Sequence, residues 1–424
     1  MYISKIELKN IRCFEDATLN LEDKNSLCRG CVILGDNGLG KTTILRSVAM
    51  SLSGEGSASG LLDEIEGGMI NDNVDTGYVC LTLKSDDGNN TFSIKTNFVK
   101  ESTGTDIVSS QEIIPKGEKF PWEEVFLCGY GASRGIRGEA QYPKYTVTDA
   151  IYTLFTLDSG FLHGPELSIR RIKDTLGSVK ILHRVLNWIA KILMLPEGSV
   201  KLEAGGLFIS DYWKNSRPVD AVADGHQATL TMICDLLGWA LLYNKETFKG
   251  ELSGIVIIDE IEQHLHPKWQ RKIVGLLQEI FPKIQFIMTT HSPLIAGNAG
   301  KLFNDGNGLK LFYAGRKNEK SEISEIEENL GELGCDQILS SEAFGNIPNL
   351  NINEKVEEVL IEASILAAKD QRTPEENAKY EKFKNKLKEL MFPKGSTLIE
   401  RETERRYYKE MERKIEEFNK ILKD

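Results

Sequence analysis

A glycine-rich segment early in the chain has the residue spacing of a phosphate-binding loop. Gly35 is followed, after four intervening residues, by Gly40, Lys41 and Thr42. Glycines let backbone N–H groups turn toward phosphate oxygens, and the N-terminus of a following helix adds its dipole. We therefore expect Lys41 to meet the β- and γ-phosphates of ATP and Thr42 to ligate Mg²⁺. The other nucleotide-binding residues expected in this loop are Asn37, Gly38, Gly40 and Thr43.

Two adjacent acids follow an apolar run much further along the chain. Residues 255–258 read Ile-Val-Ile-Ile, and Asp259 and Glu260 come directly after them. Two carboxylates at the end of a buried strand are costly unless a metal or hydrogen bonds compensate them. We therefore expect Asp259 to reach the Mg²⁺ shell and Glu260 to polarise the water that attacks the γ-phosphate.

A histidine ends the next apolar run. His291 stands in a Thr-Thr-His-Ser-Pro segment, 32 residues after Asp259. A lone histidine at a strand end is more often structural. This separation, however, is that of one strand–helix–strand unit, so we predict that His291 senses the γ-phosphate and acts with Glu260 in catalysis.

The apolar patterns around these residues indicate an α/β fold. Strands are predicted at 2–9, 17–21, 31–34, 77–84, 91–98, 125–128, 254–258, 284–288 and 309–313, with a hairpin at 200–209. Helices are predicted at 44–52, 166–195, 227–242 and 269–281, and in a charged C-terminal region at 354–369, 374–391 and 396–423. The residues expected to do chemistry each follow a predicted strand, and the carboxyl ends of parallel strands share one edge of a sheet.

In this order the motifs resemble those of ABC-type ATPases of the RecF, structural-maintenance-of-chromosomes and OLD group. The segment 6–14 is similar to the group's first strand, Gly35–Thr42 to its Walker A motif, Ile255–Glu260 to its Walker B motif and His291 to its switch histidine. The resemblance implies an α/β, ABC-type P-loop ATPase head with a helical insertion and a helical C-terminal region. The implied parts are the N-terminal half of the head at 1–160, the helical insertion at 161–200, the C-terminal half at 201–315, and a partner or oligomerisation region at 316–424.

The group's signature motif is expected to open the helix that precedes Walker B. Residues 222–227, which we call the signature segment, read Val-Ala-Asp-Gly-His-Gln at that place. The resemblance implies that Asp224, Gly225 and Gln227 close the nucleotide site of a second subunit across a head-to-head dimer. Ala223 stands where the group usually has serine, which removes one donor to the γ-phosphate and leaves fast hydrolysis in doubt.

Three segments resemble more narrowly the PtuA-type ATPases of Septu antiphage systems, which also occur beside retrons. These segments are 130–134, 259–267 and 335–339. The resemblance implies dimers or larger oligomers and a partner HNH nuclease. After residue 315 only helices are expected, without the Glu-Gly strand and Asp-x-Asp of a Toprim domain, so nuclease activity is assigned to the partner. His264 and His266 follow Walker B, where dimer contacts are expected rather than a metal site.

Two functions from different classes fit these observations. The first is an ATP-binding and ATP-hydrolysing subunit of an antiphage defence complex, which senses infection and controls the partner nuclease. The alternative is a DNA-repair ATPase of the RecF type that clamps DNA. DNA or retron nucleic acid is a further candidate partner, because basic residues are concentrated between 170 and 201 although the net charge is −11. A solvated helix face is the simpler interpretation of that stretch.

The remaining features leave several alternatives open. No run of 18 uncharged apolar residues or signal peptide is found, so a cytoplasmic protein without a membrane partner is expected. Cys28 and Cys31 form a lone CxxC, for which two buried thiols are favoured over a redox or zinc site. Gln111 and Gln141 are candidates for the glutamine that joins the Mg²⁺ shell. The last predicted helix has a seam that would pack on the head or on another subunit, at Tyr408, Met411, Ile415, Phe418 and Leu422.

Overall fold

The structure is a computed structural model, and it describes residues 1–390 with several gaps. The residues outside the description are 24–25, 87, 102–103, 134–140, 157–161, 211–215, 222–223, 245–251, 305–307, 318–319, 342–343, 345–365, 367–372 and 391–424. The chain divides into two compact units, Met1–Ile347 and Pro348–Asp424. None of the described helices is long and apolar enough to cross a membrane.

An antiparallel sheet forms one side of the first unit. Its strands are β1 (Tyr2–Ile11), β2 (Phe14–Asn20), β6 (Thr76–Lys84), β7 (Thr91–Lys100) and β8 (Asp106–Ile114), in the spatial order β2-β1-β6-β7-β8. Side chains along β6 and β7 alternate between buried and partly exposed, as expected when one face of a sheet covers a core. Two very short strands, β3 (Glu22–Asp23) and β4 (Ser26–Leu27), follow β2.

A second, six-stranded sheet carries the predicted chemistry. Its order is β16-β15-β5-β14-β13-β9, where the strands are β5 (Gly30–Gly35), β9 (Leu127–Tyr130), β13 (Ser253–Ile258), β14 (Lys283–Thr290), β15 (Leu309–Lys317) and β16 (Lys320–Glu325). All its pairs are parallel except β15 with β16. Every residue of β5 is buried, which explains why this strand reads as a continuous apolar run.

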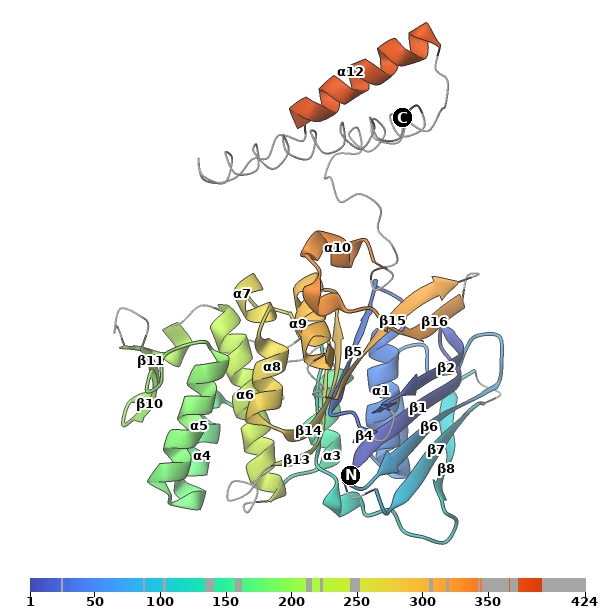
Figure 1. Ribbon diagram of the computed structural model, residues 1–424. Helices are drawn as coiled ribbons and strands as arrows, with labels where there is room; N and C mark the ends of the chain where they lie inside the picture. The colour runs from blue at the N-terminus through green and yellow to red at the C-terminus, as the bar shows by residue number, and fades with distance from the viewer. Residues whose placement is uncertain are drawn as a thin grey trace. The chain divides into compact units, whose positions relative to one another are not determined.

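Helix α1 (Lys41–Ser51) lies between the two sheets (Figure 1). Its Ile44, Leu45 and Val48 are fully buried in a core that includes residues of β1, β5 and β6. The short helix α2 (Glu55–Leu62) follows it. Because α1 begins directly after β5 and the phosphate-binding loop, the loop connects the six-stranded sheet to the helix that lies between the two sheets.

The opposite face of the six-stranded sheet is covered by helices (Figure 1). These are α4 (Pro165–Leu176), α5 (Val179–Ile192), α6 (Asp224–Tyr243), α7 (Pro267–Gln270), α8 (Ile273–Ile280) and α9 (Pro293–Asn304), with α3 (Val147–Ile151) after β9 and α10 (Cys335–Leu339) after β16. A three-stranded sheet of β10 (Val200–Glu203), β11 (Gly206–Ser210) and β12 (Ser216–Pro218) lies between α5 and α6 in sequence. The core on this side joins residues of α4, α5, α6, α8 and α9 to the sheet.

The head's sheet extends past residue 315, where only helices were expected. That boundary falls within β15, and β16 then pairs antiparallel with β15 from Phe312↔Glu325 to Lys317↔Lys320. The expectation was wrong because β16 is a polar edge strand, and its sequence lacks the apolar run that marks the central strands.

The second unit is described mainly through helix α12 (Pro374–Leu390). Thr373 and Glu376 form reciprocal backbone–side-chain hydrogen bonds at its start, the arrangement of a capping box. This helix corresponds to the one predicted at 374–391. The helix predicted at 396–423 and its apolar seam lie outside the described residues, as does nearly all of the helix predicted at 354–369.

Candidate functional site

The loop between β5 and α1 adopts a conformation that favours glycine. Gly38 and Gly40 have φ angles of 79° and 88°, in the left-handed region. A Cβ on Gly40 would lie 2.5 Å from Cys13 Sγ and 2.5 Å from Phe14 Cε2, whereas a Cβ on Gly38 would meet nothing within 4 Å. The absence of a side chain at Gly40 therefore allows the turn after β1 to pack against the loop. The backbone at Gly38, by contrast, has open space beside it.

The start of α1 has no side chain that competes for an anion. Gly40 is its N-cap, no side chain caps the first turn, and no acidic residue lies in that turn. The free N–H groups and the helix dipole at such an end favour negative charge. This end of α1 is therefore suited to bind a phosphate.

Lys41, the first residue of α1, has its ammonium group turned toward this loop. Its side chain is 6% exposed, and Nζ donates hydrogen bonds of 2.8 Å to the carbonyl oxygens of Gly35 and Asp36. Burial lowers the pKa of Lys41, and the negative charge of Asp259 opposes that shift. The ammonium group thus borders both the loop and the acids that follow β13.

Asp259 connects three elements at the carboxyl edge of the sheet. Thr42 Oγ1, on α1, donates a 2.7 Å hydrogen bond to Asp259 Oδ2. Thr289 Oγ1, at the end of β14, donates to Asp259 Oδ1 at 2.5 Å. Asp259 is 3% exposed, so these hydroxyls compensate the buried carboxylate. The structure thus brings together Thr42 and Asp259, the two residues expected to hold Mg²⁺.

Glu260 and His291 face each other next to Asp259. The distance from His291 Nε2 to Glu260 Oε1 is 3.8 Å, and both side chains are about a third exposed. Glu260 has a φ of 46°, a strained conformation for a residue with a side chain, and its N–H donates to Thr289 Oγ1 at 2.8 Å. The strain is consistent with a backbone held in place for function, and both predicted catalytic residues reach the same edge of the sheet.

Glu262 contributes to this edge although sequence reasoning did not single it out. Its Oε1 accepts a hydrogen bond from the backbone N–H of His291 at 2.5 Å, and its Oε2 accepts one from Thr290 Oγ1 at 2.7 Å. Glu262 therefore fixes the segment that carries His291. Sequence reasoning also did not single out Thr289 as a functional residue. Its position at the end of the strand next to Walker B is the feature that could have indicated such a role.

Residues 224–227 of the signature segment open α6, as predicted. Gly225 packs closely on the loop after β13, because a Cβ on it would lie 2.4 Å from the carbonyl oxygen of His264. Gln227 is 5% exposed. Val222 and Ala223, including the departure from the group's serine, lie outside the described residues, as does the side chain of Asp224.

The candidates for the Mg²⁺-shell glutamine lie elsewhere. Gln111, on β8, donates hydrogen bonds to Ser51 O at 2.9 Å and Thr96 Oγ1 at 3.1 Å. Ser51 is the last residue of α1 and Lys41 the first, so Gln111 lies at the wrong end of that helix. Gln141 lines a cavity next to the start of α4 and β11. The prediction for Gln111 was therefore wrong. The pairing of β7 with β8 places this residue, and the sequence does not reveal that pairing.

The basic residues between 170 and 201 are largely engaged within the chain. Arg170 pairs with Glu166 at 2.7 Å, and Lys191 pairs with Glu279. Arg171 donates to the carbonyl oxygen of Tyr142 at 2.9 Å, and the Arg184 guanidinium lies 5.2 Å from the Trp188 ring centre. These contacts favour the interpretation of a solvated helix face.

The histidines and cysteines of the described chain give little support to a further metal site. No group of three or more His, Cys, Asp or Glu side chains placed to hold a metal ion occurs among the described residues. His266 caps α7 by accepting a 3.2 Å hydrogen bond from Lys268 N. Cys28 and Cys31 are both buried free thiols, and burial raises the pKa of Cys31.

Comparisons with known proteins agree with this arrangement of motifs. Two family models match the chain, described as "AAA domain" at residues 5–119 and as "AAA domain, putative AbiEii toxin, Type IV TA system" at residues 201–297. The chain is 26% identical to the Septu protein PtuA of Bacillus mycoides over 357 residues, which cover 82% of this chain and 46% of that protein. The chain is thus similar to ABC-type ATPases of the PtuA type over most of its length. It is also 37% identical to the "Retron Ec83 probable ATPase" of Escherichia coli, over 35% of this chain and 28% of that protein.

The match covers less than half the length of these curated relatives. Among solved structures, the chain is similar to the SMC head domain from Thermotoga maritima, with a TM-score of 0.45, 16% identity and coverage of 77% of this chain and 100% of that chain. It is similar to a structure of the recombination mediator RecF with a TM-score of 0.42, 14% identity and coverage of 77% and 98%.

Proposed function

We propose that this chain is the ATP-binding and ATP-hydrolysing subunit of an antiphage defence complex that controls a partner HNH nuclease. The observation that carries the ATPase part is the meeting of Lys41, Thr42, Asp259, Glu260 and His291 at one edge of a parallel sheet. The defence part is supported by the similarity to Septu PtuA and to a retron ATPase.

The loop and its neighbours fit a nucleotide and Mg²⁺. The open space beside Gly38 and the uncapped start of α1 suit phosphate oxygens, and Lys41 supplies a cation at the same loop. Thr42 and Asp259 offer the hydroxyl and carboxylate oxygens that Mg²⁺ prefers. When bound, Mg²⁺ would neutralise charge on the β- and γ-phosphates.

Hydrolysis would use the two side chains that face each other beside Asp259. Glu260 would accept the proton of the attacking water, because its carboxylate is partly exposed at the end of the strand. His291 would donate a hydrogen bond toward the γ-phosphate, with its backbone fixed by Glu262. Thr289 would hold Asp259 and the Glu260 backbone in a fixed relation.

A second copy of the chain would complete the site through Asp224, Gly225 and Gln227. Ala223 lacks the hydroxyl that the resemblance leads one to expect, so turnover would be slow and ATP would mainly hold the assembly in one state. The loss of nucleotide would then release or activate the nuclease. The cytoplasm is the proposed compartment.

The alternative, a RecF-like clamp on DNA, is less well supported. It requires cationic side chains free to meet phosphates, and several of the basic residues between 170 and 201 are engaged within the chain.

Phage challenge of cells that carry this gene with its neighbouring HNH gene tests the proposal. We expect wild-type cells to reduce plaque formation, and cells with Lys41→Ala to lose both protection and ATP binding by the purified complex. Lys320→Ala, which removes an exposed lysine paired with Glu15, is the control that should retain both. Full protection by Lys41→Ala would contradict the proposal, and salt-sensitive binding of duplex DNA by the chain alone, without any protection by the wild type, would argue for the alternative.

A further inference from the structure

Asp235 joins three elements in the core next to the nucleotide site. It lies on α6 and is fully buried. Its Oδ2 accepts a 2.9 Å hydrogen bond from the hydroxyl of Tyr130, on β9. Its Oδ1 accepts one of 2.7 Å from the backbone N–H of His163, just before α4, and lies 2.8 Å from His163 Nδ1. The His163 ring also packs edge-on against Trp239, one turn further along α6, with ring centres 4.5 Å apart.

Tyr130 connects this cluster to Walker B. Its backbone carbonyl accepts a 2.8 Å hydrogen bond from Asp259 N, and β9 pairs with β13 at Ile258↔Tyr130. Burial, together with the charge of Asp235, raises the pKa of the Tyr130 hydroxyl well above its ordinary value. Tyr130 therefore remains a hydrogen-bond donor, and it contacts Asp259 through its backbone and Asp235 through its side chain.

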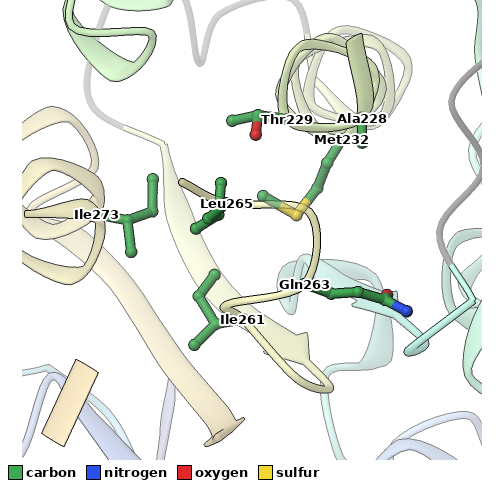
Figure 2. A pocket seen from close by; sticks show the side chains of 7 residues that line it. All are labelled: Ala228, Thr229, Met232, Ile261, Gln263, Leu265 and Ile273. Atoms are coloured by element: carbon green, nitrogen blue, oxygen red, sulfur yellow. The ribbon is translucent and has the colours of Figure 1, made fainter. Parts of the chain in front are cut away.

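The N-terminal half of α6 has a different kind of support. Ala228, Thr229 and Met232 face Ile261 and Leu265 of the loop after β13, and Ile273 lies across from them (Figure 2). Gln263 belongs to the same loop, but its amide group points away from the apolar side chains (Figure 2). Apolar contacts of this kind have no preferred direction.

The hydrogen bonds of Asp235 are directional and involve a charged acceptor, which makes them stronger and more exacting in geometry. Burying a carboxylate also costs free energy, and an apolar side chain would be sufficient at this position if its only role were packing. The cluster thus has the properties needed to fix the position of α6 relative to β9 and β13. Asp235 is eleven residues after Asp224, the first residue of α6, so a shift of the helix at the cluster also moves its start, which carries Gly225 and Gln227.

We propose that Asp235, acting through Tyr130, is a positioning residue that sets the start of α6, and with it the backbone of Asp224, Gly225 and Gln227, relative to Walker B. This inference rests on the proposed function, because the signature segment must serve the nucleotide site of a second copy. Cutting the link should leave nucleotide binding intact and slow hydrolysis at the partner's site.

Tyr130→Phe is the primary variant, and Tyr145→Phe is its matched control. Both remove a hydroxyl that is hydrogen-bonded within the chain, but Tyr145 is only partly buried and bonds the backbone of Leu127 instead of Asp235. We expect Tyr130→Phe to lower kcat for ATP about tenfold while KM and ATP affinity stay unchanged, because misplaced groups slow chemistry more than binding. Asp235→Asn should behave in the same way, and Tyr145→Phe should keep kcat. Equal kcat values for Tyr130→Phe and Tyr145→Phe would overturn the proposal.

Mixed subunits distinguish positioning from a general structural effect. A subunit with Lys41→Ala has a dead nucleotide site but an intact signature segment, so it should restore turnover to the site of a Tyr130→Phe subunit. Mixing Tyr130→Phe with Gly225→Ala should restore nothing, because both defects affect the signature segment. If Lys41→Ala restores turnover to Gly225→Ala but not to Tyr130→Phe, the role proposed for Tyr130 is overturned. Absence of rescue in both mixtures would overturn the composite site, and this inference with it.

Discussion

The Thr42 hydroxyl donates a 2.7 Å hydrogen bond to Asp259 Oδ2, although 217 positions separate the two residues. The pair brings the helix that follows the phosphate loop into contact with the strand that supplies the acids. Thr42 and Asp259 would supply hydroxyl and carboxylate oxygens to Mg²⁺, and water and phosphate oxygens would supply its other ligands.

Asp259→Asn should therefore remove most of the metal dependence of nucleotide binding. For the wild-type protein, we expect EDTA to weaken the binding of a fluorescent ATP analogue at least tenfold, since Mg²⁺ offsets the charge of the phosphates. In Asp259→Asn the affinity should be low already and nearly insensitive to EDTA. Asp86→Asn, in an exposed pair with Arg29, is the control and should keep the wild-type response. A full EDTA effect in Asp259→Asn would place the metal elsewhere.

Gly40→Ala should weaken ATP binding for steric reasons. The new Cβ would lie 2.5 Å from Cys13 Sγ and from Phe14 Cε2, so the turn after β1 would have to move away from the phosphate loop. Gly177, the C-cap of α4, also has left-handed angles but has nothing within 4 Å of an added Cβ. Gly177→Ala should cost about 1 kcal/mol of stability and leave ATP affinity unchanged. Equal ATP affinity in the two variants would show that close packing at Gly40 is unimportant.

Glu260→Gln should trap ATP without hydrolysing it. The amide cannot accept the proton of the attacking water, and the loss of a general base typically costs roughly 10²–10⁴-fold in rate. Bound nucleotide, extracted and separated after incubation with ATP, should be ATP in the variant. In the control Glu279→Gln, which removes a surface ion pair with Lys191, it should be largely ADP. Unchanged turnover in Glu260→Gln would exclude it as the base.

Glu262→Ala should disturb His291 without touching the nucleotide. It removes the acceptor of the His291 backbone N–H and of the Thr290 hydroxyl. We expect kcat to fall about tenfold, with Glu262→Gln intermediate because one of its two terminal atoms still accepts. The double variant with His291→Ala should be no slower than His291→Ala alone, since the two residues act as a unit. Additive losses in steady-state kinetics would mean that Glu262 acts independently.

Subunits with complementary defects should restore a composite site. Lys41→Ala disables the phosphate loop, and Gly225→Ala forces a Cβ to within 2.4 Å of the His264 carbonyl oxygen at the signature segment. Each variant alone should lack turnover, whereas one of the two sites in a mixed dimer is intact. A randomly paired equimolar mixture, in which about half of the dimers are mixed, should therefore recover about a quarter of the wild-type rate per site. Native mass spectrometry would confirm that mixed dimers form. Inactive mixed dimers would show that each subunit completes its own site.

Local patterns in the sequence determined much of this protein. The loop at Gly35–Thr42, the acids after an apolar run and His291 after the next run follow from residue types and spacing, because buried parallel strands and phosphate loops have strong local signatures. The structure places all of them at the carboxyl edge of one sheet. The strand β16 could not be predicted from the sequence, because a polar edge strand has no apolar period. The position of Gln111 could not be predicted either, because strand pairing is non-local.

Only the tertiary structure decided which side chains support the site. Nothing in the sequence indicates that Glu262 fixes the His291 backbone or that Thr289 holds Asp259, since both depend on the register of β13 beside β14. The contact from Tyr130 to Asp235 spans 105 positions and joins a strand to a helix packed on it. The chain's local preferences determine where strands and helices begin and end, whereas the packing of the whole core determines which polar groups meet.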